Sequence, residues 1–180
     1  DERISNLRKR VRIVELLHEI QKPTIALIRG WAVGAGMSIA LACDLRYGDL
    51  TAKFKTGFID MGLSGDFGGH YFLPRIVGYA KAREMYLLSP TINAETAYKL
   101  NLLNEVFEED DLYPAVLQIA NNFGEKSKTA IGCIKENLNL ALGLPLQEML
   151  DQEIIRHIAC TESEEFSLAT KRFVKRRESG

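Results

Sequence analysis

The sequence is poor in cysteine and contains no apolar run of membrane-spanning length. Its three cysteines, Cys43, Cys133 and Cys160, stand far apart and form no Cys-x-x-Cys pair, which argues against a disulfide framework and indicates buried thiols in a reducing compartment. The uncharged run over residues 30–43 is shorter than the ~20 residues that a membrane helix needs. No apolar signal core follows the charged first residues, so we expect a cytoplasmic protein that contacts no membrane.

Neither sign of charge dominates, because 23 Lys and Arg stand against 24 Asp and Glu in 180 residues. The net charge of −1 supplies no global attraction to nucleic acid, so we expect no nucleic-acid partner. Hydrophobic residues at 46% and charged residues at 26% exclude a disordered chain and a coiled-coil rod. A chain of this length buries roughly 70% of its unfolded surface. The composition therefore predicts a cored domain that needs no structural metal, and we predict no metal site.

The pattern along the chain predicts an α/β fold. Residues 3–20 have an apolar helical face and residues 24–28 form a β-rich apolar run. The basic cluster over residues 8–12 fits a solvated helix face, with RNA binding as the alternative. Further elements are expected as strands at 44–47 and near 52–54, a turn at 30–36, and helices at 37–43, 81–88, 94–100, 111–123, 127–142 and 147–177 with a break near Thr161.

Glycine is concentrated in one stretch, because ten of the 14 glycines lie between Gly30 and Gly78. Backbone geometry that only glycine adopts easily is therefore expected there, together with the functional site. The turn Gly34-Ala35-Gly36 follows the strand at 24–28 and opens a helix, so its unpaired N–H groups could hold a developing oxyanion. The alternative is that these glycines only let the helix pack closely against the strand.

Asp66 is the second informative residue, because Gly65, Gly68 and Gly69 surround it and let a ligand come close. A carboxylate in that position can remove and return a proton. The alternative is an aspartate that only forms the turn.

Ser38 permits a different class of enzyme, since Gly36-Met37-Ser38-Ile39-Ala40 approximates a nucleophile elbow. A serine hydrolase would need His70 or His157 as its base. The segments after Ser38 are expected to be mainly helical, which disfavours this alternative.

Two signatures resemble those of the crotonase superfamily, the enoyl-CoA hydratases and isomerases. The first runs from Lys22-Pro23-Thr24-Ile25-Ala26 through Gly30-Trp31-Ala32-Val33-Gly34-Ala35-Gly36 to Ala40-Leu41-Ala42-Cys43-Asp44. The second is Gly62-Leu63-Ser64-Gly65-Asp66-Phe67-Gly68-Gly69 with Leu73-Pro74-Arg75-Ile76-Val77-Gly78. The resemblance implies a crotonase-like core of ββα units arranged in a spiral over residues 1–123, with its first strands upstream of Asp1. It also implies a helical region at 124–180 that forms a homotrimer or a dimer of trimers.

The resemblance further implies an acyl-CoA substrate whose thioester oxygen lies between two backbone N–H groups. The donor at the matching position is Ala35, and its partner would lie upstream of Asp1, as would most contacts to the adenine and pyrophosphate. No cofactor is expected beyond the coenzyme A that belongs to the substrate. Lys171, Lys175 and Arg176 are similar to the family's basic terminal helix, which approaches CoA phosphates, although a solvated helix end is the alternative.

The departures from the family pattern favour one reaction. Hydratases of the family hold water between two glutamates, and the matching positions here are Ser38 and Phe58. Asp66 matches the aspartate base of the isomerases, and one base suffices to move a double bond. We therefore predict an enoyl-CoA isomerase with Asp66 as the proton shuttle and a pocket lined by Gly34, Gly36, Ser38, Phe58, Gly65 and Gly69. The alternatives are a hydratase that activates water differently and a non-catalytic homologue that binds CoA or RNA.

Overall fold

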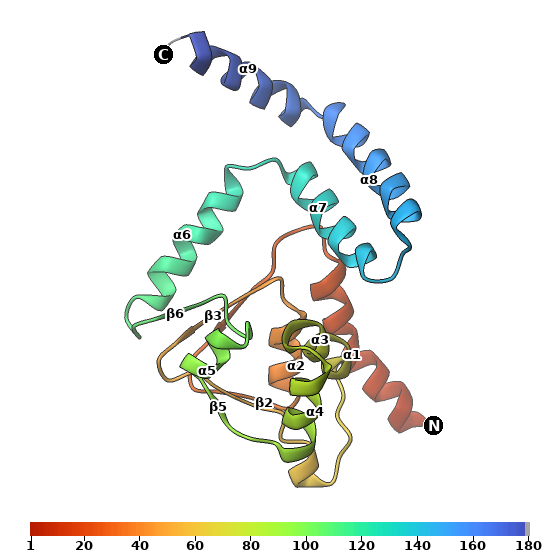
Figure 1. Cartoon of the computed structure of the whole chain (residues 1–180), viewed down its shortest axis with the longest axis vertical. Coiled ribbons are helices and arrows are strands. Elements are labelled where there is room, and N and C mark those ends of the chain that lie inside the picture. Colours follow the sequence, from red (N-terminus) through yellow and green to blue (C-terminus); the bar gives the residue numbers. More distant parts are fainter. Residues whose placement is uncertain (179–180) are drawn as a thin grey trace. The chain divides into compact units, whose positions relative to one another are not determined.

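The computed structural model describes the backbone of residues 1–178 and the side chains of residues 1–171 and of Phe173 (Figure 1). The chain forms two compact units. Unit 1 comprises Asp1–His18 and Thr24–Ile119, and unit 2 comprises Glu19–Pro23 and Ala120–Gly180. The assignment of residues 1–123 and 124–180 to a core and an oligomerisation region stays a prediction.

Two small sheets lie in unit 1. In the first, β3 (Leu45–Asp49) pairs in parallel with β1 (Ile25–Ile28) and with β6 (Glu105–Phe107). In the second, β4 (Lys53–Lys55) pairs in parallel with β2 (Trp31–Val33) and antiparallel with β5 (Ile92–Asn93). The first four strands therefore alternate between the two sheets, and Gly30 makes the corner between β1 and β2 at a positive φ of 61°. Two strands followed by a helix form the predicted ββα unit.

Helices make up most of the remaining chain (Figure 1). A short 3-10 helix, η1, precedes the second glycine cluster, and α6 runs from unit 1 into unit 2. Among the described residues no helix is both long and apolar enough to cross a bilayer. The helices and their bounds are α1 (Glu2–Glu19), α2 (Ala35–Ala42), η1 (Ile59–Met61), α3 (Gly69–Val77), α4 (Tyr79–Leu88), α5 (Ala94–Lys99), α6 (Leu112–Gly124), α7 (Lys128–Ala141), α8 (Leu146–Thr161) and α9 (Glu164–Glu178).

The core of unit 1 joins the sheets to α2, α3 and α4. Its largest fully buried apolar side chains come from these elements and from the segment after α5: Met37, Phe54, Leu73, Met85, Leu102 and Leu103. Burying each of them contributes roughly 1.5–3 kcal/mol before the entropy of ordering is counted. Arg46 is buried beside this core, and its guanidinium donates hydrogen bonds to the carbonyls of Cys43 at 2.6 Å and Leu102 at 3.0 Å. The charge is therefore satisfied within the fold.

Several predicted elements are confirmed, among them the first helix, the strand at 24–28 and the break near Thr161. Three predictions are wrong. Residues 30–36 contain β2 rather than a turn alone, because pairing with β4 outweighs the local preference of a glycine-rich segment. The segments of β5 and β6, expected within a mainly helical part, are two- and three-residue strands too short to show alternation. Cys133 and Cys160 are only partly buried, because both lie on helices of unit 2 whose apolar faces remain uncovered.

Candidate functional site

The site begins at the turn that opens α2. Gly34 has φ 56° and ψ −120°, a conformation that side chains rarely adopt, and its N–H donates to the carbonyl of Lys55 at 3.0 Å. Ala35 is the first residue of α2, so its N–H precedes the hydrogen-bond ladder of the helix. The turn therefore presents a backbone donor at the positive end of a helix dipole.

Phe58 connects this turn to the second glycine cluster. A Cβ built on Gly34 would lie 3.6 Å from the Phe58 ring, and one built on Gly65 would lie 3.3 Å from it. The segment before Phe58 is held on α4, because Thr56 Oγ1 donates to the carbonyl of Met85 at 2.7 Å. The structure thus brings two predicted pocket residues, Gly34 and Gly65, against the ring of a third, Phe58.

Asp66 lies in a backbone segment of left-handed residues. The φ values are 107° at Gly65, 52° at Phe67 and 72° at Gly68. A phenylalanine in this region costs about 1 kcal/mol or more, and such strain gathers at functional sites. Asp66 is half-buried, and none of the described residues forms a hydrogen bond with its buried Oδ1 atom. Because buried carboxylate oxygens are normally paired, this free acceptor is the feature that most clearly points to chemistry.

Gly69 stands where two hydroxyl groups converge. A Cβ on Gly69 would lie 2.6 Å from Ser38 Oγ and would collide with Tyr86 Oη. Ser38 is 2% exposed, and its hydroxyl donates to the carbonyl of Gly34 at 3.2 Å. Ser38 therefore faces the turn, and no hydrogen bond joins it to an imidazole within residues 1–171, which removes the support for a serine hydrolase.

Tyr86 is a further residue of the site, and it was not predicted from the sequence. Its ring stacks on His70 with centroids 4.1 Å apart and planes 11° apart. Burial, and to a lesser degree the charge of Asp66, raises the pKa of Tyr86 to about 12, so the phenol stays protonated at physiological pH. Tyr86 lies in α4, and no sequence motif marks it.

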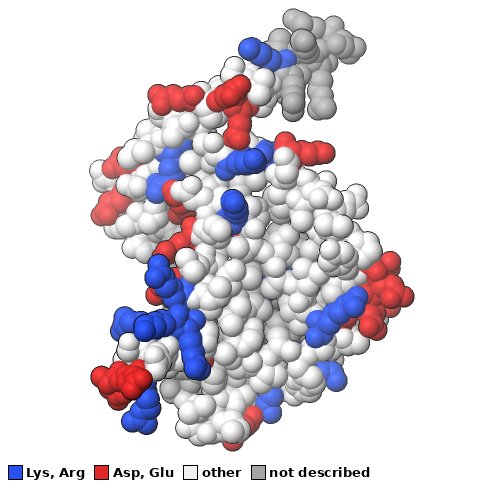
Figure 2. All heavy atoms as spheres, turned by 180° about the vertical axis from the view of Figure 1, so that it is seen from behind, with Lys and Arg blue, Asp and Glu red and all other residues white. Residues whose placement is uncertain are grey.

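A groove of about 390 Å³ opens beside Asp66. One wall is the face of α1 that the sequence predicts to be apolar, and the other is the backbone-strained segment over residues 66–68. Its lining is mainly apolar and suits an acyl group, and the exposed Arg8 adds one cation to it. Figure 2 shows Lys and Arg side chains gathered at the lower left of that view. The lining residues are Ile4, Leu7, Arg8, Val11, Glu15, Asp66, Phe67 and Gly68.

Gly36 and the predicted CoA-phosphate residues do not belong to the cluster around Phe58, Asp66 and Gly69. Gly36 is exposed, and a Cβ built on it would meet nothing within 4 Å. Lys171 is exposed in unit 2, and the side chains of Lys175 and Arg176 lie outside the described part of the chain. Within that described part, no three His, Cys, Asp or Glu side chains gather in a way that could hold a metal ion.

Residues 7–180 match the family model of enoyl-CoA hydratase/isomerase. The chain belongs to this enzyme family. It is 33% identical over 147 residues to 4-chlorobenzoyl coenzyme A dehalogenase-1 of Arthrobacter sp, with 82% of this chain and 53% of that protein covered. It is also 33% identical over 141 residues to 1,2-epoxyphenylacetyl-CoA isomerase of Escherichia coli (strain K12), with 78% of this chain and 54% of that protein covered.

Solved structures of the family agree with the fold. The crystal structure of an enoyl-CoA hydratase from Polaromonas sp. JS666 has a TM-score of 0.90 and 28% identity, and the match covers 94% of this chain and 66% of that one. The predicted crotonase fold is confirmed. The chain spans about half the length of the two relatives named above. The family contains dehalogenases, isomerases and hydratases by these names, so the reaction of this chain has to be argued from its own site.

Proposed function

We propose that this protein is an enoyl-CoA isomerase in which Asp66 takes a proton from one carbon of the acyl group and returns it to another. The observation that carries the proposal is the buried Oδ1 atom of Asp66, which has no partner and belongs to a residue that lines an apolar groove. A carboxylate held this way can accept a proton from carbon and keep it from water. No cofactor is needed beyond the CoA thioester.

Ala35 supports the same reaction. Removing the proton turns the thioester into an enolate, whose oxygen carries the developing charge. The Ala35 N–H at the start of α2 is one donor for that oxygen, and a single donor of this kind accounts for roughly 10²–10³ in rate. Gly34, whose Cβ would meet the Phe58 ring, lets the backbone turn so that this donor is presented.

Hydration has weaker support, because the two positions that match the hydratase glutamates hold no carboxylate. Ser38 donates its hydroxyl hydrogen to Gly34, and Phe58 places an apolar ring against Gly34 and Gly65. The other carboxylate lining the groove, Glu15, is exposed on α1. One base without a second acid favours proton shuttling over the addition of water.

The dehalogenase relative suggests a second candidate function. Asp66 could attack an acyl-CoA that carries a leaving group, expel that group as an anion and form an ester that water then cleaves. Release of chloride from 4-chlorobenzoyl-CoA would support this candidate, and its absence would leave isomerisation.

The test is a screen of 2-enoyl-, 3-enoyl- and 3,5-dienoyl-CoA thioesters that follows double-bond migration and water addition separately. We expect migration, and we expect Asp66→Asn to reduce it roughly 10²–10⁴-fold, as for loss of a general base. Asp110→Asn is the control, because it makes the same change at an exposed aspartate outside the groove and should leave the rate within about twofold. An unchanged rate in Asp66→Asn would refute the proposal. Salt-sensitive RNA retention without turnover would favour a non-catalytic homologue.

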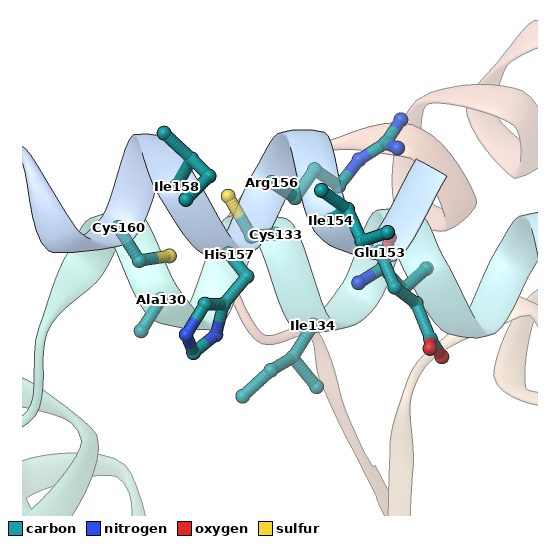
Figure 3. A pocket seen from close by; sticks show the side chains of 10 residues that line it. Ala130, Cys133, Ile134, Glu153, Ile154, Arg156, His157, Ile158 and Cys160 are labelled. Carbon is teal, nitrogen blue, oxygen red and sulfur yellow. The ribbon is translucent and has the colours of Figure 1, made fainter. Parts of the chain in front are cut away.

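We also propose that unit 2 assembles copies of this chain into a homotrimer or a dimer of trimers, with Lys171, Lys175 and Arg176 contacting CoA phosphates. A pocket of about 630 Å³ opens along α7 and α8, and Figure 3 shows Ile134, Ile154 and Ile158 around it. Apolar side chains of α8 are widely exposed, which in a folded protein marks an interaction surface. They are Leu146, Leu150, Ile154, Ile155 and Ile158.

A further inference from the structure

The Oδ1 atom of Asp66 needs a hydrogen-bond donor while the carboxylate is charged. It is buried and has no hydrogen-bond partner among the described residues, and leaving such an acceptor unpaired is unfavourable by about 1–3 kcal/mol. Two hydroxyl groups converge beside Gly69, three residues further along the chain, and they belong to Ser38 and Tyr86. Gly69 is in turn joined to Asp66, because its N–H donates to the Asp66 carbonyl at 3.3 Å.

Ser38 is already engaged. Its hydroxyl donates to the carbonyl of Gly34 at 3.2 Å, and the side chain is 2% exposed, so it has little freedom to turn away. None of the hydrogen bonds described for residues 1–171 involves the Tyr86 hydroxyl, and burial raises its pKa to about 12, so it stays protonated. Tyr86 is also the group whose ionisation responds to the charge of Asp66. Tyr86 is therefore the donor that remains.

The ring of Tyr86 is fixed in place, whereas the carboxylate can turn. His70 stacks on the ring at 4.1 Å, and the neighbouring Met85 carbonyl accepts a hydrogen bond from Thr56. Asp66 has two rotatable side-chain bonds on a backbone that Gly65 and Phe67 hold in left-handed conformations. A rotation of the carboxylate toward the phenol thus requires no movement of α4.

We infer that Tyr86 is a positioning residue that donates a hydrogen bond to the Asp66 carboxylate and holds it in line for proton transfer. The inference rests on the proposed isomerase function. Tyr86 does not itself exchange a proton with the substrate: the proton moves between carbon and Asp66, and the phenol keeps its own. The hydrogen bond strengthens when Asp66 is charged and weakens when it has accepted the proton.

The test is Tyr86→Phe, which removes the hydroxyl and keeps the ring that stacks on His70. We expect kcat for 3-enoyl-CoA isomerisation to fall roughly 10- to 100-fold, as for loss of a hydrogen bond to a charged group, with KM changed less than about twofold. Tyr79→Phe is the matched control, since it makes the same change on the same helix at a residue that is 69% exposed. It should leave both constants unchanged.

A second measurement does not depend on activity. In a protein labelled with ¹³C at the tyrosine ring carbon that bears the hydroxyl, the resonance absent from Tyr86→Phe belongs to Tyr86. That resonance should move in Asp66→Asn, while the Tyr79 resonance stays in place. If the wild-type protein isomerises the thioester and Tyr86→Phe is equally fast, the inference is wrong and the proposed function stands. If the wild type isomerises no thioester, the proposed function fails, and an unmoved Tyr86 resonance would overturn the inference separately.

Discussion

Gly69 and Gly36 offer a paired test of how tightly the site is packed. Both are helical glycines, so alanine at either position gains up to about 1 kcal/mol in helix propensity. A Cβ on Gly36 meets nothing within 4 Å, whereas one on Gly69 would lie 2.6 Å from Ser38 Oγ and would overlap Tyr86 Oη. We therefore expect the two substitutions to change stability in opposite directions.

The neighbours of Gly69 cannot easily move away. Ser38 is buried and bonded to Gly34, and the Tyr86 ring is stacked on His70. Overpacking of this kind costs typically 1–3 kcal/mol. After the gain in helix propensity, Gly69→Ala should lower the free energy of unfolding by up to about 2 kcal/mol, while Gly36→Ala should raise it by up to about 1 kcal/mol.

Urea unfolding followed by circular dichroism measures both changes. Adding Ser38→Ala to Gly69→Ala should recover part of the loss, because it removes the oxygen nearest the new methyl group apart from that of Tyr86. If Gly69→Ala is as stable as Gly36→Ala, the convergence of Ser38 and Tyr86 on this glycine is wrong. Tyr86 would then not lie beside Gly69, and its role as the donor to Asp66 would be unsupported.

Two further predictions concern charge and assembly. Lys55 Nζ lies 2.8 Å from Asp60 Oδ2, and this hydrogen bond lowers the pKa of Asp60, so the stabilisation is present at neutral pH and is lost as the pH falls through the folded-state pKa. Lys55→Met should therefore lower the urea midpoint at pH 7, and this effect should shrink as the pH falls through the folded-state pKa of Asp60; an effect of the same size at neutral and strongly acidic pH would contradict this. Ile154→Glu should shift the sedimentation coefficient toward that of a monomer, because it places a charge on the exposed apolar face of α8, whereas Tyr113→Glu at a 62% exposed residue should not. Unchanged sedimentation of Ile154→Glu would argue against assembly through α8.

The sequence predicts those parts of the site that depend on local backbone geometry. The turn at Gly34 and Ala35 follows a strand and opens a helix, and Asp66 is a single acid among glycines, so both are visible without a structure. The structure brings both Gly34 and Gly65 against the ring of Phe58, in agreement with the predicted pocket. Gly34, Ala35, Gly65 and Asp66 all lie within the two sequence signatures that resemble those of the family.

Tyr86 could not be predicted in the same way. Its place beside Ser38 and Gly69 depends on how α4 packs on the segment before Phe58, through the hydrogen bond from Thr56. Such a contact joins residues about thirty positions apart in sequence and leaves no periodic signal. The same reason explains why β5 and β6 were missed, because their pairing partners lie far away in the chain.

The most direct test of the central claim follows the hydrogen itself. A 3-enoyl-CoA deuterated at C2 should give a 2-enoyl-CoA that carries part of the label at C4, because one carboxylate removes the hydrogen and returns it before it exchanges fully with water. Asp66→Asn should abolish both the reaction and the transfer. Rapid isomerisation by Asp66→Asn, with the label still carried to C4, would contradict the assignment of Asp66 as the proton shuttle.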